Sequence, residues 1–297
     1  MAPRIWSQLT RTRPSPLSPP AGTAAEHLLA ATLPVETELG SEFVRAAAQR
    51  DEWQIPAPED REGYYGDNHA NYWLSGLRDR QRALAWNSEA GNPLPRRVLE
   101  IGAASGRVIR HFAAQDPMCE TWATDIDGQH VEWMTQHLGK RLMPVHTTIL
   151  PSLPLADSSL DLVLAYSVLT HIDVLETAWL AEIRRVLRPG GLALVTVHTE
   201  RSWELLEPGL GLYDSLLDLA GSISEIEVSE AMLAGPMPAP RIAMSWPTVA
   251  DVYNSVVFHS REYIRDRWGR YFDVLDIIDE GSEYQAVVIL RVPILQP

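Results

Sequence analysis

The chain has 297 residues, a formal net charge of −14, 45% hydrophobic residues and one cysteine, Cys119. This length predicts one large domain with additions or two small domains, and a single cysteine excludes an internal disulfide and a cysteine-based zinc cluster. The acidity disfavours nucleic acid as a partner and favours a small-molecule or neutral substrate. No apolar stretch reaches the roughly 18 residues of a membrane span, so we expect no membrane partner and a cytoplasmic protein.

Residues 1–25 hold five prolines, three arginines and no acidic residue. Because they lack an apolar segment, they predict a flexible tail rather than a secretory signal. Helical spacing dominates residues 26–95, where Tyr72, Leu77 and Leu84 align as an apolar stripe. This region is either an ordinary packing face or a helical cap over a ligand site. Its end, "EAGNPLPR" (89–96), is punctuated by Gly and Pro and predicts a linker.

Residues 96–297 alternate between buried strands and helices. "RRVLEI", "ETWATDI", "RLMPVHTTI", "LDLVLAYSVL" and "LALVTVHT" read as strands with helical patterns between them. Near the end, "FDVLDIID" and "YQAVVILRV" are joined by only "EGSE", which allows only an antiparallel pair. The pattern predicts a Rossmann-like α/β fold with a mostly parallel seven-stranded sheet and an antiparallel C-terminal strand. Residues 200–256 break the pattern and predict an inserted substrate lid.

The stretch "VLEIGAASGRVIRHF" (98–112) places small residues between a strand and a helix. Such a turn lets a ligand approach the backbone beside a helix N-terminus, where Ser105 is expected to be the N-cap. Glu100 precedes the turn by two positions, and Asp125 follows it by about 20, as expected for an acid that binds ribose hydroxyls. The turn is neither G-x-G-x-x-G nor a lysine-containing phosphate loop. It suits a ligand with a cationic, amine-bearing end and no phosphates.

With these residues the sequence resembles class I S-adenosylmethionine-dependent methyltransferases. "VLEIGAASGRVIRHF", "ATDIDGQHVEW", "LPLADSSLDLVLAYSVLTHID", "WLAEIRRVLRPGGLALVTVHT" and "VVFHSREYIRDRW" occur in the order of that family. The resemblance covers residues 96–292 apart from the insertion. It is closest to bacterial enzymes that methylate sugars, glycans or other small metabolites, and it implies S-adenosylmethionine as cofactor.

The resemblance also implies roles for single residues. The loop that would wrap the methionine part of the cofactor consists of Gly102, Ala103, Ala104, Ser105, Gly106 and the following Arg107. Glu100 resembles the acid that organises this loop and the amino group. Asp125 resembles the ribose-binding acid, with Ile126 packing on adenine and Asp127 as a second polar contact. Where relatives carry an Asp for the adenine amine, this chain has Ile149, followed by Leu150.

The residues after the fourth strand are expected to face the methyl donor, because ligands bind at the carboxyl ends of parallel strands. They include Tyr166, Ser167, Thr170 and His171. His171 is the first candidate base, and its alternative role is to orient the following helix. His259 is the second candidate and His198 the third, with Tyr166 as a further catalytic candidate. Asp157 and Asp161 do not form a convincing ligand set, so we expect no metal.

The sequence therefore predicts a methyltransferase that acts on a small molecule or glycan, with oxygen as the expected acceptor. Nitrogen and carbon acceptors stay open, as do a non-methylating S-adenosylmethionine binder and a nucleotide-dependent oxidoreductase. A nucleic-acid methyltransferase is disfavoured by charge. Several aromatic residues of the insertion and its edge form either a substrate wall or the insertion's own core, namely Trp203, Tyr213, Trp246, Tyr253 and Phe258.

Overall fold

The computed structural model describes residues 39–218, 228–245 and 255–294. Its internal contacts divide the chain into a first unit within Trp6–His146 and a second unit within Thr147–Pro297. The expected tail (1–25) and the start of the expected cap (26–38) lie outside the described residues. No helix among the described residues has the length and apolarity needed to cross a membrane.

The first unit begins with a helical layer over an apolar cluster. It contains α2 (Ser41–Arg50), the 3-10 helix η2 (Pro58–Arg61) and the long helix α3 (His69–Glu89). The side chain of Asn68 caps α3 by accepting a hydrogen bond from the Asn71 N–H at 3.0 Å. Tyr72, Trp73 and Leu77 of α3 are buried in one cluster with Val44 of α2. Tyr72 and Leu77 of the apolar stripe therefore pack in this cluster, and the role of the region as a cap stays a prediction.

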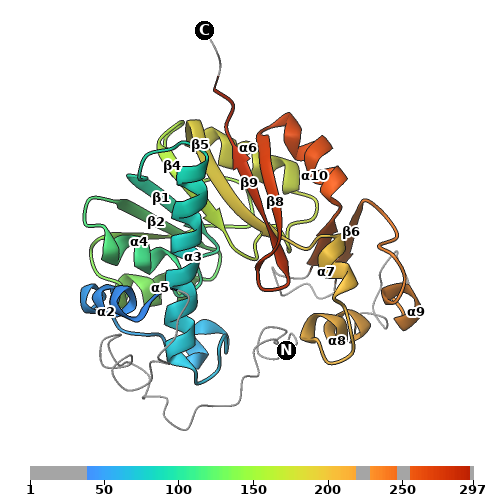
Figure 1. Cartoon of the computed structure of the whole chain (residues 1–297), viewed down its shortest axis with the longest axis horizontal. Coiled ribbons are helices and arrows are strands. Elements are labelled where there is room, and N and C mark those ends of the chain that lie inside the picture. Colours follow the sequence, from blue (N-terminus) through green and yellow to red (C-terminus); the bar gives the residue numbers. More distant parts are fainter. Residues whose placement is uncertain (1–38, 219–227, 246–254, 295–297) are drawn as a thin grey trace. The chain divides into compact units, whose positions relative to one another are not determined.

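The sheet of the first unit is parallel. It consists of β1 (Arg97–Ile101), β2 (Glu120–Asp125) and β3 (Leu142–His146) in the order β3-β2-β1. Helix α4 (Ile109–Gln115) connects β1 to β2, and α5 (Gly128–His137) connects β2 to β3. Figure 1 shows α3 and α4 beside these strands, and α3 packs on α4. The loops after β1 and β2 leave the same edge, since the strands run in the same direction.

The second unit combines a parallel pair with an antiparallel hairpin. Strand β4 (Leu160–Ala165) pairs parallel with β5 (Leu187–Val197), and α6 (Glu176–Val186) lies between them in the chain. Strand β5 pairs antiparallel with β9 (Gln285–Arg291), which pairs antiparallel with β8 (Asp273–Ser282). Figure 1 shows β8 and β9 as a long hairpin. The mixed α/β class, the mostly parallel strands and the antiparallel C-terminal strand are confirmed.

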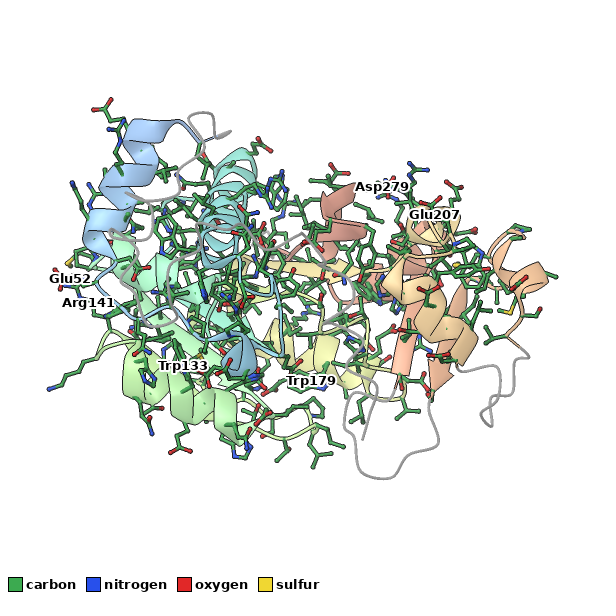
Figure 2. All side chains as sticks on the ribbon, turned by 90° about the horizontal axis from the view of Figure 1, so that it is seen from below. Glu52, Trp133, Arg141, Trp179, Glu207 and Asp279 are labelled. Carbon is green, nitrogen blue, oxygen red and sulfur yellow. The ribbon has the colours of Figure 1, made fainter. Side chains whose placement is uncertain are left out.

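The insertion folds into short elements of the second unit. They are α7 (Glu200–Glu204), α8 (Gly211–Asp218), α9 (Glu230–Leu233) and the antiparallel pair β6 (Arg241–Ser245) and β7 (Ser255–His259). Helix α10 (Arg261–Arg267) and the 3-10 helix η4 (Trp268–Arg270) lead to β8, where Asp279, labelled in Figure 2, pairs with Arg261 at 2.6 Å. Trp203 packs on Phe258 with ring centroids 5.0 Å apart, and both are buried with Tyr213. Trp203 and Phe258 thus pack on each other, whereas Trp246 and Tyr253 lie outside the described residues.

Candidate functional site

The loop after β1 is built on left-handed backbone. Gly102, Ala104 and Gly106 have φ angles of 64°, 46° and 77°. Ala104 bears a side chain, so this conformation is costly unless neighbouring contacts hold it. Its N–H donates to Asp125 Oδ2 at 2.7 Å, which fixes the loop to the end of β2. Ala103 is buried in the same turn.

The expectation that Ser105 caps the next helix is wrong. Helix α4 begins at Ile109 and its N-cap position is Val108, so residues 106–108 still belong to the turn. The hydroxyl of Ser105 donates instead to the carbonyl oxygen of Asp60. The acceptor for the helix is Glu100, whose Oε2 accepts from the Ile109 N–H at 2.8 Å. The Glu100 oxygen thus satisfies an N–H of the helix N-terminus, which is the role that a serine cap would otherwise fill.

Glu100 is a buried carboxylate with few partners. It is 3% exposed at the end of β1. Burial raises the pKa of Glu100 to about 8, while the charge of Arg107 and the Ile109 hydrogen bond oppose this rise. Burial disfavours the ionised form because water no longer solvates it. The site therefore holds a carboxyl group that a cationic ligand would ionise.

The carboxylate of Asp125, at the end of β2, accepts more hydrogen bonds than that of Glu100. Its two oxygens accept from the N–H groups of Ala104 at 2.7 Å and Asp127 at 2.9 Å. Burial would raise the pKa of Asp125, but His130 and these two N–H groups together hold it below the usual value. Asp127 caps α5 by accepting from the Gln129 N–H at 2.7 Å, and Ile126 beside it is half-buried.

A segment of the N-terminal region, Pro58–Tyr65, contacts this loop, which the sequence reasoning missed. Besides the Asp60 contact, the guanidinium carbon of Arg107 lies 5.7 Å from the ring centroid of Tyr64, while its Nη1 pairs with Asp79 of α3 at 2.5 Å. The Nε2 of His130 lies 3.9 Å from Glu62 Oε1, and its Nδ1 lies 3.9 Å from Asp125 Oδ1. The sequence feature that could have indicated this contact is the pair of tyrosines between glycines, "GYYG" (63–66).

Three of these side chains form a group with metal-ligand chemistry. Glu62, Asp127 and His130 bring one ligand atom each within 4.8 Å of one another. The Asp127 oxygen that caps α5 is already engaged with the Gln129 N–H. The expectation of no metal stays a prediction.

In the second unit, the residues after β4 are held by hydrogen bonds. Ser167 has a left-handed φ of 55°, and its N–H donates to Thr196 Oγ1 at 2.7 Å. Its hydroxyl lies 2.9 Å from Gln285 Nε2, a buried residue that the sequence reasoning also missed. Tyr166 is half-buried beside Ser167. A polar residue in left-handed backbone directly after a strand is typical of a functional turn.

His171 has the tautomer that a base requires. Its Nδ1 lies 2.7 Å from the carbonyl oxygen of Ser255, an acceptor only, so Nδ1 carries the proton. In the neutral ring, Nε2 then carries the lone pair. Burial lowers the pKa of His171, with the Ser255 hydrogen bond opposing, so the neutral form prevails at pH 7. His198, the third candidate, is buried and stacks on Tyr284 with ring centroids 5.6 Å apart.

His259 lies in a different environment. It is fully buried, and its Nε2 donates to Glu176 Oε2 at 2.7 Å. The same carboxylate accepts from Arg241, Tyr263 and Trp268 at 2.8, 3.1 and 2.9 Å. This geometry favours a structural role for His259 over that of a base.

The residues expected near the adenine ring, Ile149 and Leu150, lie at the start of the second unit. Ile149 and Leu150 are both exposed. The carbonyl oxygen of Ile149 accepts from the indole N–H of Trp179 at 3.1 Å; Trp179 is labelled in Figure 2. This backbone acceptor has a second lone pair, so it can take a further donor.

The residues of the first unit fit S-adenosylmethionine. The cofactor carries a positive sulfonium and an amino group, and a nearby cation would favour ionisation of the Glu100 carboxyl, whose pKa burial raises despite the charge of Arg107. Asp125 lies at the end of β2, and a carboxylate there is the type of group that accepts hydrogen bonds from ribose hydroxyls. The left-handed turn lets a ligand approach the backbone closely.

Known proteins are similar to parts of this chain. Residues 99–195 match the methyltransferase domain family. The chain is 31% identical over 149 residues to the ubiquinone/menaquinone biosynthesis C-methyltransferase of Cupriavidus necator, a match over 48% of this chain and 59% of that protein. It is 28% identical over 141 residues to the malonyl-[acyl-carrier protein] O-methyltransferase of Hahella chejuensis, over 47% and 50%. The chain thus spans about half the length of the curated relatives it matches.

Solved structures resemble it more weakly. A glycopeptide N-methyltransferase with S-adenosyl-L-homocysteine has a TM-score of 0.48 and 17% identity, over 76% of this chain and 98% of that one. The 1,6-didemethyltoxoflavin-N1-methyltransferase of Burkholderia thailandensis has a TM-score of 0.47 and 16% identity, over 88% and 94%. Taken with the loop geometry, the domain match identifies residues 99–195 of this chain as a methyltransferase domain of the class I S-adenosylmethionine-dependent family.

Proposed function

We propose that this protein transfers the methyl group of S-adenosylmethionine to a small molecule or glycan, at oxygen. The observation that carries the proposal is the left-handed loop between two buried carboxylates, Glu100 and Asp125, within the matched domain. When bound, the cofactor supplies a methyl group already activated on a sulfonium sulfur, so the chain has to bind, align and exclude water.

His171 is the group that favours an oxygen acceptor. A hydroxyl becomes a good nucleophile as its proton leaves, and a neutral imidazole is suited to take that proton at neutral pH. In the proposed step the acceptor oxygen bonds to the methyl carbon as the carbon–sulfur bond breaks, and His171 Nε2 takes the hydroxyl proton. The Ser255 carbonyl holds the ring in the required tautomer. Tyr166 and Ser167 would contact cofactor or acceptor beside it.

Cofactor binding tests the first half of this proposal. Calorimetry with S-adenosylmethionine and S-adenosylhomocysteine should show micromolar binding. Asp125→Ala should weaken both ligands, because the ribose loses a charged acceptor worth about 1.5–3 kcal/mol. Asp157→Ala, a change at an exposed carboxylate of the second unit, is the matched control and should leave affinity unchanged. If neither ligand binds the unmodified protein, the proposal fails.

Acceptor chemistry tests the second half. Release of S-adenosylhomocysteine should be screened against hydroxyl-bearing sugars and phenols, amines and carbon acids. With an active hydroxyl acceptor, we expect His171→Gln to reduce kcat by about 10²–10⁴-fold and leave cofactor affinity unchanged. His137→Gln on α5 is the control. Turnover of amines alone would instead assign nitrogen as the acceptor.

A further inference from the structure

The first unit contains two buried arginines whose surroundings differ. Arg110 donates to both oxygens of Asp51, at 2.9 and 3.0 Å, and to the carbonyl oxygens of Trp53 and Gln54, both at 3.0 Å. Its guanidinium is thus paired with a carboxylate in a bidentate geometry and is fully buried. This is how a buried arginine is normally stabilised.

Arg61, at the end of η2, has no such partner. It is 3% exposed, and only its Nη2 makes hydrogen bonds, to the Gly66 carbonyl at 2.7 Å and to His69 Nδ1 at 2.9 Å. Its Nε and Nη1 have no hydrogen-bond partner, and no carboxylate of the described residues lies within ion-pair distance. Burial lowers the pKa of Arg61, and the nearby exposed carboxylates of Asp67 and Glu59 offset only part of this effect.

The groups in direct contact with the Arg61 guanidinium are neutral, and the carboxylates of Asp67 and Glu59 act on it only from beyond ion-pair distance. His69 is buried and accepts from the arginine at Nδ1, so its ring is neutral; burial and the Arg61 charge lower its pKa. The guanidinium lies over the ring of Tyr72, 4.5 Å from the centroid. The buried Tyr72 hydroxyl also lacks a partner, and burial raises its pKa to about 12, so it keeps its proton. Three buried hydrogen-bond donors without an acceptor, Nε and Nη1 of Arg61 and the hydroxyl of Tyr72, thus belong to two side chains in contact.

These two side chains adjoin the loop after β1. The carbonyl of Asp60, the residue before Arg61, accepts the hydroxyl of Ser105 in the loop. On α3, Gly76 follows Tyr72 by one turn and packs so closely on the loop that an added Cβ would collide with the Arg107 carbonyl. The charges of Arg107 and Glu100 both act on the Tyr72 hydroxyl. Arg61 and Tyr72 are therefore beside the loop that would hold the amino-acid end of the cofactor.

We propose that Arg61 and Tyr72 form an anion subsite that binds the carboxylate of the cofactor's amino-acid end, an inference that rests on the proposed function. That end of S-adenosylmethionine carries one positive amino group and one negative carboxylate. Glu100 complements the first and the Arg61 guanidinium the second. Arginine is suited to the task because its planar fork matches a carboxylate, and the Tyr72 hydroxyl adds one further donor.

Ligands with and without the amino-acid end provide the test. Calorimetry should compare S-adenosylhomocysteine with 5′-methylthioadenosine, which lacks the carboxylate and the amino group. We expect Arg61→Gln to weaken S-adenosylhomocysteine by about 10- to 100-fold and to leave 5′-methylthioadenosine unchanged, because only the first ligand carries the anion. Tyr72→Phe should weaken the first ligand by about 3- to 10-fold. Arg97→Gln, at an exposed arginine of β1, should change neither.

Each outcome decides one of the two proposals. Unchanged 5′-methylthioadenosine binding shows that Arg61→Gln still folds, and Arg61→Lys, which keeps the charge, should recover part of the affinity. Equal weakening of both ligands, or of neither, overturns the anion subsite, while Asp125→Ala still reports on the cofactor site. If the unmodified protein binds neither ligand, the proposed function itself fails.

Discussion

Glu100 of β1 in the first unit and Glu176 at the start of α6 in the second unit are both buried, but their carboxyl groups differ in their hydrogen bonds. Glu176 at the start of α6 accepts from His259, Arg241, Tyr263 and Trp268, and these donors outweigh burial and lower its pKa to about 2. Glu100 accepts from the Ile109 N–H, and burial raises its pKa to about 8.

Burial is common to both residues, at 4% and 3% exposure, so the difference lies in the donors. The Glu176 carboxylate, with its four donors, stabilises the fold by connecting α6 to Arg241 of β6 and His259 of β7. A carboxyl group left short of donors is costly to keep and is typical of a ligand site. The comparison therefore supports a structural role for Glu176 and the proposed binding role for Glu100.

The largest effect is expected from Glu176→Leu. The substitution leaves Arg241, His259, Tyr263 and Trp268 without their common acceptor, and removal of one partner from a buried charged pair costs about 3–5 kcal/mol. Urea unfolding should show this loss. Glu204→Leu, at an exposed pair with Arg201, is the control and should cost less than about 1 kcal/mol. A similar cost for both would remove the structural role of Glu176.

The free energy of unfolding at acidic pH should also depend on the Glu176 carboxylate. The pKa of Glu176 in the folded protein, about 2, is below the 4.5 of the unfolded chain, so its contribution is complete above pH 4.5 and disappears as pH falls to about 2. The size of this contribution is about 3 kcal/mol. Urea unfolding between pH 6 and pH 3 should show a steep loss in the unmodified protein and a shallower loss in Glu176→Gln.

Glu100 should show the opposite pH dependence. Its folded pKa, about 8, exceeds the unfolded 4.5, so stability of the ligand-free protein is complete below pH 4.5 and decreases as pH rises to about 8. Glu100→Gln removes this decrease. Because a cationic ligand binds the ionised form, S-adenosylmethionine affinity should rise by up to about tenfold per pH unit from pH 6 to 8. The same titration with Glu100→Gln should be flatter and weaker, and equal slopes would contradict the binding role.

Local sequence signals were sufficient for the scaffold. The alternation of strand and helix patterns and the short link between the last two strands predicted the α/β class and the antiparallel C-terminal pair, because both depend on residues close in the chain. Glu100 and Asp125 could be placed at strand ends for the same reason. The Ser105 cap failed because the turn could continue to Val108, and the distant carboxylate of Glu100 took the helix N-terminus.

Contacts across long chain separations could not be predicted. Asp60 meets Ser105 over 45 residues, and Gln285 meets Ser167 over 118. No periodicity reports such pairs, because they depend on how complete elements pack. That Arg61 Nε and Nη1 have no hydrogen-bond partner among the described residues is equally invisible in sequence, since it too depends on packing rather than on a motif.

The smallest expected effect concerns Ser167. Here the unfavourable free energy comes from the backbone conformation rather than from a buried charge. Left-handed backbone costs a residue with a side chain about 1 kcal/mol relative to glycine. Ser167→Ala and Ser167→Gly both lose the hydroxyl bond to Gln285, so the difference between them isolates the backbone. We expect Ser167→Gly to be more stable by about 1 kcal/mol in urea unfolding. The same pair of substitutions at Ser158, φ 54°, is the matched control and should give the same difference. If Ser167→Gly also lowers kcat as much as Ser167→Ala, the hydroxyl matters for the reaction; full activity in both would leave Ser167 as a turn residue only.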